Sequence, residues 1–304
     1  MTLTSLAATL VFVSSPCSEP VGNSVIKAPY AGSEIVITTT SRVAGAIHSL
    51  KWDGVEFIDS RDHGRQLQSA SNFDAGSKFS GETFNPTEAG SRRDGAGSTS
   101  SSKLLHLISH RRQLQTTTQM AFWLRPGDKS ANNIAKNKTI VSNHLLTKRV
   151  VIGYRDMPNV VQYDATFTLP VDEKHTYAQF EAVTGYMPPA FSKFYTCEPV
   201  TGKLNSASDG PGEQNFPLVF STEDGSHAMG IYSPQQPSKN YENAGYGRWR
   251  FSAQRVVKWN CVFRIQNAKG IPADDYRFRN FVIIGSRDVV ASTIKRLAKL
   301  QPER

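Results

Sequence analysis

A hairpin near the start of the chain decides the fold, and it reads Ala46-Ile47-His48-Ser49-Leu50-Lys51-Trp52-Asp53-Gly54-Val55-Glu56-Phe57-Ile58-Asp59. Two runs of alternating apolar and polar residues flank the pair Asp53-Gly54. A type I′ turn needs positive φ at both central positions, and Asp-Gly is among the pairs that adopt it most readily. The stretch therefore predicts two antiparallel strands joined by a two-residue turn.

The same period-two pattern returns farther along the chain. Residues 145–154 and 160–169 predict a second pair of strands, separated by a turn at residues 156–159. In the second of these strands an apolar face opposes a polar face. The apolar face holds Tyr163, Ala165, Phe167 and Leu169, and the polar face holds Gln162, Asp164, Thr166 and Thr168.

The remainder of the chain reads as strands followed by one late helix. Strands are predicted at residues 34–40, 114–123, 177–186, 217–221, 227–233, 246–251, 256–265 and 279–285. Ser286 resembles a helix N-cap, and the apolar spacing after it predicts a helix over residues 287–300. Because strands and helices do not alternate, a parallel α/β fold is excluded. We expect an all-β fold, a large antiparallel β-sandwich with one C-terminal helix.

Composition limits the partners. The 304 residues carry a net charge of +9, but no basic run exceeds two residues, so we expect no nucleic-acid partner. The positive charge favours an acidic partner in general, which leaves an anionic membrane surface or an acidic polysaccharide. No stretch reaches the ~18 apolar residues of a membrane span.

The first residues resemble a leader. Residues 6–13 are apolar, and small residues follow them, so residues 1–24 predict a signal-like segment and a secreted or periplasmic protein. An N-terminal strand or a disordered leader is the alternative. Residues 25–304 are then expected to form a single sandwich domain.

Signals for metals and cofactors are weak. The three cysteines show no metal-binding spacing, and Cys197 and Cys261 either form a disulfide or remain two separate thiols. His106 and His110 are four residues apart, but on a strand rather than a helix. We therefore predict no metal site, and the absence of phosphate-binding glycine motifs predicts no cofactor.

Two polar clusters lie beside and within a Gly/Ser-rich segment, residues 69–102, which we expect to be a long loop. The first is His63-Gly64-Arg65-Gln66-Leu67-Gln68, and the second is Asn85-Pro86-Thr87-Glu88-Ala89-Gly90. An imidazole and a carboxylate move protons near neutral pH, whereas guanidinium and amide groups bind hydroxyl groups. We predict that His63 and Glu88 transfer protons and that Arg65, Gln66, Gln68 and Asn85 bind substrate. Each of them is also explained by a purely structural role.

Aromatic residues near strand ends complete the predicted site. Tyr186 ends a predicted strand before Met187-Pro188-Pro189, where it either donates a proton or packs in the core. Tyr241 and Trp249 belong to a segment rich in aromatics, Asn and Arg. Aromatic faces pack against sugar rings, so we expect these two residues to line a sugar, with an ordinary surface loop as the alternative.

The hairpin carries a family resemblance. Residues 41–50 and 52–58 resemble the opening hairpin of galactose-mutarotase-like proteins, and His227-Ala228-Met229-Gly230-Ile231-Tyr232 resembles a late strand of the same sandwiches. The resemblance implies a β-supersandwich, which sugar epimerases, several polysaccharide lyases and domains of some glycoside hydrolases share. It also implies chemistry by a histidine with a glutamate or a tyrosine.

Together these features predict a carbohydrate-active enzyme that cleaves a glycosidic bond by cofactor-free acid/base chemistry. Hydrolysis and β-elimination remain open at this point. A sugar mutarotase or epimerase and a non-catalytic carbohydrate-binding protein are the alternatives.

Overall fold

The computed structural model describes residues 19–234 and 244–300. Within them the protein is all-β, with antiparallel strand pairing and one α-helix near the C-terminus, α1 (Arg287–Leu300). The predicted fold class is confirmed. This helix is neither long nor apolar enough to cross a membrane.

The strands form two antiparallel runs joined through one short strand. The first sheet runs in the order β1 (Ser24–Tyr30), β2 (Ser33–Thr39), β3 (Ile47–Trp52), β5 (Leu67–Phe73), β13 (Tyr177–Met187), β20 (Val256–Gln266), β19 (Gly245–Phe251) and β16 (Gly212–Gln214). The second sheet runs β7 (Lys103–His110), β8 (Gln113–Phe122), β11 (Val141–Tyr154), β12 (Met157–Thr168), β21 (Asp275–Gly285), β18 (Ala228–Tyr232), β17 (Leu218–Ser221), β14 (Lys193–Cys197) and β15 (Leu204–Ser206). The linking strand, β6 (Pro86–Thr87), pairs with both β5 and β8.

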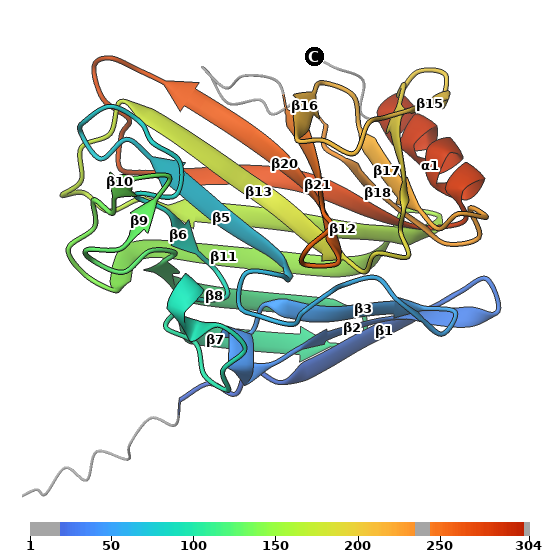
Figure 1. Cartoon of the computed structure of the whole chain (residues 1–304). Coiled ribbons are helices and arrows are strands. Elements are labelled where there is room, and N and C mark those ends of the chain that lie inside the picture. The colour runs from blue at the N-terminus through green and yellow to red at the C-terminus, as the bar shows by residue number, and fades with distance from the viewer. Residues whose placement is uncertain (1–18, 235–243, 301–304) are drawn as a thin grey trace, which may run out of the picture.

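Short elements complete the fold. They are β4 (Val55–Glu56), the β9 (Lys129–Ser130) and β10 (Asn133–Ile134) hairpin, and the 3-10 turns η1 (Ser41–Val43) and η2 (Arg92–Asp94). Figure 1 shows α1 beside β17 and β18, at the opposite end of the molecule from the β9–β10 hairpin.

The hairpin that opens the fold forms as predicted. Asp53 and Gly54 have φ of 50° and 74°, so both central turn residues lie in the left-handed region. Trp52 pairs with Val55 and Lys51 pairs with Glu56. The strand after the turn is only two residues long.

The second predicted pair also forms, with its turn two residues earlier than expected. β11 ends at Tyr154 and β12 begins at Met157, so Arg155 and Asp156 make the turn. Arg155 has φ of 52°, and Gly153 lies in a bulge at φ of 90°. Pro158 is accommodated near the start of a strand, where proline is tolerated. The alternating faces of β12 are confirmed, because Tyr163, Ala165 and Phe167 are buried.

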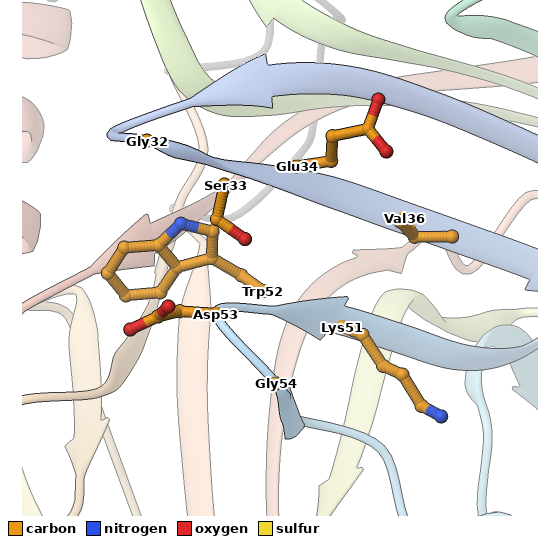
Figure 2. Close-up of a pocket in the computed structure, with 8 residues that line it drawn as sticks. All are labelled: Gly32, Ser33, Glu34, Val36, Lys51, Trp52, Asp53 and Gly54. Carbon is orange, nitrogen blue, oxygen red and sulfur yellow. The ribbon is translucent and has the colours of Figure 1, made fainter.

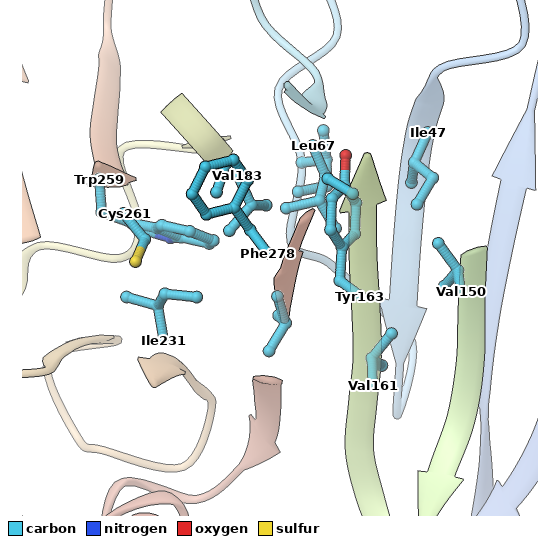
Figure 3. Close-up of a cluster of buried hydrophobic side chains, with 14 of the residues drawn as sticks. Ile47, Leu67, Val150, Val161, Tyr163, Val183, Ile231, Trp259, Cys261 and Phe278 are labelled. Carbon is cyan, nitrogen blue, oxygen red and sulfur yellow. The ribbon is translucent and has the colours of Figure 1, made fainter. Parts of the chain in front are cut away.

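The main core lies between the two sheets and draws on both of them (Figure 3). Tyr163, Val150 and Phe278 come from the second sheet, and Val183 and Trp259 come from the first. A smaller core forms where Val290, Ile294 and Leu297 of α1 cover the other face of the second sheet. Val289, which the sequence placed in that apolar stripe, is 39% exposed.

The segment predicted as a long loop begins with a strand instead. β5 occupies residues 67–73, and all of its residues are buried. Its neighbours β3 and β13 flank it in the first sheet, which explains the burial of such a polar sequence, LQSASNF. Cys197 and Cys261 are buried free thiols and do not form a disulfide.

The predicted leader overlaps the fold at its end. Residues 1–18 lie outside the described residues, but Gly22 donates a backbone hydrogen bond to Ser41 Oγ at 2.8 Å. β1 then starts at Ser24 and pairs with β2 along its whole length.

Candidate functional site

Polar side chains gather on the face of the first sheet that points away from the core. Side chains alternate between the two faces of a strand, and cross-strand partners share a face. In the β13–β20 register Tyr186 lies opposite Lys258, and Thr184 lies opposite Asn260. A bulge between Glu181 and Val183 keeps Glu181 on this same face. We call Glu181, Tyr186, Trp249, Lys258 and Asn260 the polar cluster.

Glu181 holds the two polar residues of β20. Its Oε1 accepts hydrogen bonds from Asn260 Nδ2 at 3.0 Å and from Lys258 Nζ at 3.4 Å. The side chains of Lys258 and Glu181 are 14% and 16% exposed. This ion pair is therefore largely shielded but still reached by solvent, as a substrate-binding group must be.

Two aromatic rings enclose the ammonium group of Lys258. Its Nζ lies 5.2 Å from the ring centroid of Tyr186 and 4.9 Å from that of Trp249, within the range of cation–π attraction. Tyr186 and Trp249 are both half-buried. The structure thus brings together two aromatic residues that the sequence selected separately.

The electrostatics of the cluster favour a protonated tyrosine beside a charged lysine. Burial raises the pKa of the Tyr186 phenol, and the nearby Lys258 opposes this only in part. Burial alone would lower the pKa of Lys258, but the negative charge of Glu181 and the contact with Tyr186 raise it above its usual value. At neutral pH the cluster therefore presents one neutral phenol, one ammonium and one carboxylate partner.

Arg65 lies at the Tyr186 end of this face. Its guanidinium contacts Asp62 Oδ2 at 3.0 Å and Asp59 Oδ2 at 3.7 Å, and donates to the Gln254 carbonyl at 3.3 Å. The backbone N–H of Asp59 donates to the Tyr186 carbonyl at 2.8 Å, which ties this segment to the end of β13. Of the first predicted motif, Arg65 belongs to the segment tied to the end of β13, and Gln68 lies opposite Thr184 in the β5–β13 register.

Glycine at position 247 allows the indole of Trp249 to lie across β19. A Cβ at Gly247 would stand 2.4 Å from Trp249 Cη2 and 2.5 Å from Asn260 Oδ1. The backbone N–H of Gly247 also donates to that same oxygen at 3.0 Å.

We therefore expect Gly247→Ala to displace the indole and to lower the free energy of unfolding by about 1–3 kcal/mol, the usual cost of overpacking. Tryptophan fluorescence and denaturant titration measure the two effects. Gly81→Ala is the matched control, because no atom lies within 4 Å of a Cβ there. If Gly247→Ala and Gly81→Ala show the same fluorescence and the same free energy of unfolding, Gly247 does not set the position of the Trp249 indole.

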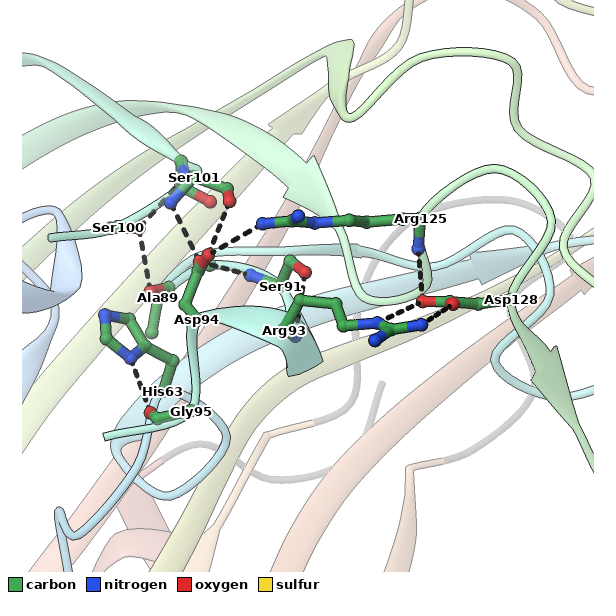
Figure 4. Close-up of polar contacts among 12 residues, drawn as sticks. His63, Ala89, Ser91, Arg93, Asp94, Gly95, Ser100, Ser101, Arg125 and Asp128 are labelled. Carbon is green, nitrogen blue, oxygen red and sulfur yellow. Dashed lines mark hydrogen bonds and ion pairs between the residues drawn. The ribbon is translucent and has the colours of Figure 1, made fainter. Parts of the chain in front are cut away.

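The structure places His63 in a buried backbone junction, 1% exposed. Its Nδ1 lies 2.7 Å from the Gly95 carbonyl and its Nε2 lies 2.6 Å from the Arg42 carbonyl. Both neighbours accept hydrogen bonds only, so the ring donates to both only when it is doubly protonated. Figure 4 shows His63 against Gly95, next to Asp94, which accepts from Ser91 N and Ser101 N at 2.8 Å.

Glu88 pairs with Lys148, not with His63 or Arg65 as its predicted role would need. Both partners are fully buried between the sheets. The second carboxylate oxygen of Glu88 accepts from Ser69 N at 3.1 Å, and Ser69 Oγ lies 2.9 Å from the Tyr163 hydroxyl. Glu88 thus belongs to a polar network inside the core.

The predicted amide ligands are also buried and bonded to the backbone. Gln68 accepts from Ala89 N at 3.0 Å, and Gln66 donates to the Asp62 carbonyl at 2.6 Å. Asn85 donates to the Ser71 carbonyl at 2.5 Å. These contacts hold the loop segments against β5. Tyr241 lies outside the described residues.

A groove between the β1–β2 and β3–β4 turns is separate from these residues (Figure 2). Ser33, Glu34, Lys51 and Trp52 are among the residues that line it, and none of the predicted site residues does. Glu34 is paired with Lys27 at 3.0 Å. The groove is wide open to solvent, so we do not assign it chemistry.

Sequence reasoning missed Lys258, Glu181 and Asn260. The signal was present in residues 256–265, where Lys258, Asn260 and Arg264 fall at even spacing in an otherwise mostly apolar strand. Such a polar stripe on a central strand indicates a functional face. It becomes informative once the strand is known to lie beside β13.

No family model and no curated protein matches this chain. Among solved structures, it is similar to an alpha-mannosidase from Enterococcus faecalis V583, with a TM-score of 0.51, 10% identity, and coverage of 91% of this chain and 32% of that chain. A candidate aldose 1-epimerase from Escherichia coli K12 matches with a TM-score of 0.46, 10% identity, and coverage of 87% of this chain and 100% of that chain. A heparan sulfate lyase from Pedobacter heparinus matches with a TM-score of 0.43, 9% identity, and coverage of 88% of this chain and 35% of that chain.

These comparisons concern the fold of the chain. The mannosidase match supports a shared architecture over most of this chain, which spans about a third of that enzyme. The expected resemblance to carbohydrate-active β-sandwiches is confirmed at the level of the fold.

Proposed function

We propose that this protein is a carbohydrate-active enzyme that cleaves a glycosidic bond at the polar cluster. The observation that carries the proposal is the convergence of Tyr186 and Trp249 on the ammonium group of Lys258. Aromatic faces pack against sugar rings, and the charged and amide groups beside them bind hydroxyl or carboxylate groups.

The substrate class is an acidic glycan. Lys258 lies against the Tyr186 ring, Arg65 belongs to the segment tied to the end of β13, and the chain carries a net charge of +9. A uronate carboxylate would exchange with the Glu181 or Asp62 carboxylates that now pair with these cations. Asn260 then offers an amide to a hydroxyl group of the same sugar.

Tyr186 and Glu181 are the proton-transfer pair. In hydrolysis, Glu181 takes a proton from the attacking water while Tyr186 protonates the leaving glycosidic oxygen as the bond between carbon and oxygen breaks. In β-elimination, Glu181 takes the proton from the carbon next to the uronate carboxylate, and Tyr186 again protonates the leaving oxygen. Because the pKa of the Tyr186 phenol is raised, the phenol is protonated at neutral pH and carries a proton that either reaction can use.

The test is incubation of the purified chain with a matched panel of neutral and uronic-acid glycans. We expect new reducing ends from acidic glycans and fewer or none from neutral ones. Absorbance from unsaturated uronates separates elimination from hydrolysis. A change of optical rotation without new reducing ends would indicate epimerisation instead, and binding without any turnover would overturn the enzymatic proposal.

A further inference from the structure

Two histidines and a glutamate meet at the far end of β13 from Tyr186. His144 belongs to β11, whereas Glu173 and His175 belong to the connection between β12 and β13. The Nε2 atoms of His144 and His175 lie 2.6 Å and 2.9 Å from the same oxygen, Glu173 Oε2. Tyr177, two residues after His175, is nine residues before Tyr186, so this cluster stands about 30 Å from Tyr186.

The two imidazoles are held rigidly in an apolar setting. His144 and His175 are 0% and 3% exposed, and Phe73 packs against both rings with centroids 5.0 Å and 4.6 Å away. Phe84 packs against them from 6.1 Å and 5.4 Å. Glu173 is the open side of the cluster, since its side chain is 19% exposed.

Hydrogen bonds within the cluster involve the Nε2 atoms of the two histidines and leave their Nδ1 atoms unsatisfied. Glu173 occupies both Nε2 atoms, yet the buried Nδ1 atoms of His144 and His175 have no hydrogen-bond partner among the described residues. Unsatisfied buried polar atoms cost free energy.

We propose that His144, Glu173 and His175 form a zinc site, with Nε2 of each histidine and a carboxylate oxygen of Glu173 as the three protein ligands. The candidate ligand atoms all lie within 4.8 Å of one another. Zinc–ligand bonds of about 2.0–2.2 Å place the donor atoms roughly 3–4 Å apart, so side-chain adjustments of about an ångström bring these atoms into position. Two imidazoles and one carboxylate suit zinc, and the fourth position faces solvent beside Glu173.

Asp74 supplies the supporting contact that metal-bound histidines usually have. When zinc takes the Nε2 lone pair of His175, the ring proton resides on Nδ1, which lies 3.6 Å from Asp74 Oδ1. Asp74 is itself fixed by Thr176, whose backbone N–H donates to it at 3.1 Å and whose hydroxyl donates at 2.5 Å. The bound ion would fasten the β12–β13 connection to β11 and to the end of β5.

The test uses the full chain, stripped with a chelator and then titrated with zinc chloride. We expect one zinc per chain by mass spectrometry of the metal after dialysis, and a higher thermal midpoint with zinc than without it. Cobalt in place of zinc gives a visible spectrum that reports a four-coordinate site with nitrogen ligands. A chain that takes up no zinc and shows neither the thermal shift nor the cobalt spectrum overturns the proposal.

Two variants locate the site. Glu173→Gln keeps the shape of a partly exposed residue, so it folds even if His144→Ala does not, and we expect it to weaken zinc affinity by at least about tenfold. The control His106→Ala/His110→Ala removes two exposed histidines from β7 and leaves affinity unchanged. Unchanged zinc affinity in Glu173→Gln, or a loss confined to the control, contradicts the assignment.

Discussion

Lys148→Met should lower the free energy of unfolding by about 3–5 kcal/mol, because it leaves the carboxylate of Glu88 buried without its cation. Both side chains are fully buried, and they are in direct contact. Glu88 is closed off from bulk solvent, and among the described residues Lys148 is its one ion-pair partner. Denaturant titration, compared at constant slope with the wild-type chain, measures the loss.

The neighbours of this ion pair cannot replace the positive charge that Lys148→Met removes. Ser69 N donates to Glu88, and Lys148 Nζ stands 5.8 Å from the ring centroid of Tyr163. Burial and the charge of Glu88 raise the pKa of Tyr163 far above its usual value, so this phenol stays neutral and cannot compensate for the lost ammonium.

The double variant Lys148→Met/Glu88→Gln separates charge from packing. It removes both charges and keeps an acceptor for Ser69 N, so we expect it to recover most of the stability that the single variant loses. Lys51→Met, an exposed lysine on β3, is the control and should change stability by less than about 0.5 kcal/mol. A loss below about 1 kcal/mol in Lys148→Met would show that the pair is not structural.

The strands with one buried face were predictable from the sequence. β12 alternates buried Tyr163, Ala165 and Phe167 with polar residues, and period two alone identifies such a strand. The Asp53-Gly54 turn was predictable for a separate reason, since the conformation it needs restricts the residues that fit. Both features depend on residues that are close together in the sequence, so the sequence alone predicts them.

β5 was not predictable, because its burial comes from its neighbours. Ser69, Ser71 and Asn72 have no strand preference of their own, and only the flanking strands β3 and β13 supply their environment. The same burial gives several residues of the two polar motifs a structural role. His63, Gln68 and Glu88 were selected as a concentration of reactive groups, but each of them is bonded to backbone groups around this strand, and Glu88 also pairs with Lys148.

The candidate site was predictable in part. Tyr186 and Trp249 were recognisable as aromatic residues in polar surroundings, and they do meet. Their common partner Lys258 was not recognisable, because its position depends on the register between β13 and β20. A register joins residues about seventy positions apart, and no local pattern encodes it.

Tyr186→Phe should reduce kcat for glycan cleavage by about 10²–10⁴-fold, the usual contribution of a positioned proton donor. The phenyl ring keeps its contact with Lys258, so KM should change little and the thermal midpoint should stay near that of the wild type. Phe cannot protonate the leaving oxygen, and Glu181 is already bonded to Lys258 and Asn260. The loss should therefore fall on the chemical step.

Tyr276→Phe is the matched control for this experiment. Its phenol donates to the Pro272 carbonyl at 2.6 Å, so the substitution also removes one hydroxyl and one hydrogen bond, but on the second sheet. We expect Tyr276→Phe to have the same kcat as the wild-type chain. If Tyr186→Phe instead raises KM and leaves kcat unchanged, the hydroxyl binds substrate without transferring a proton, and the proton donor must be sought among the other groups of the same face.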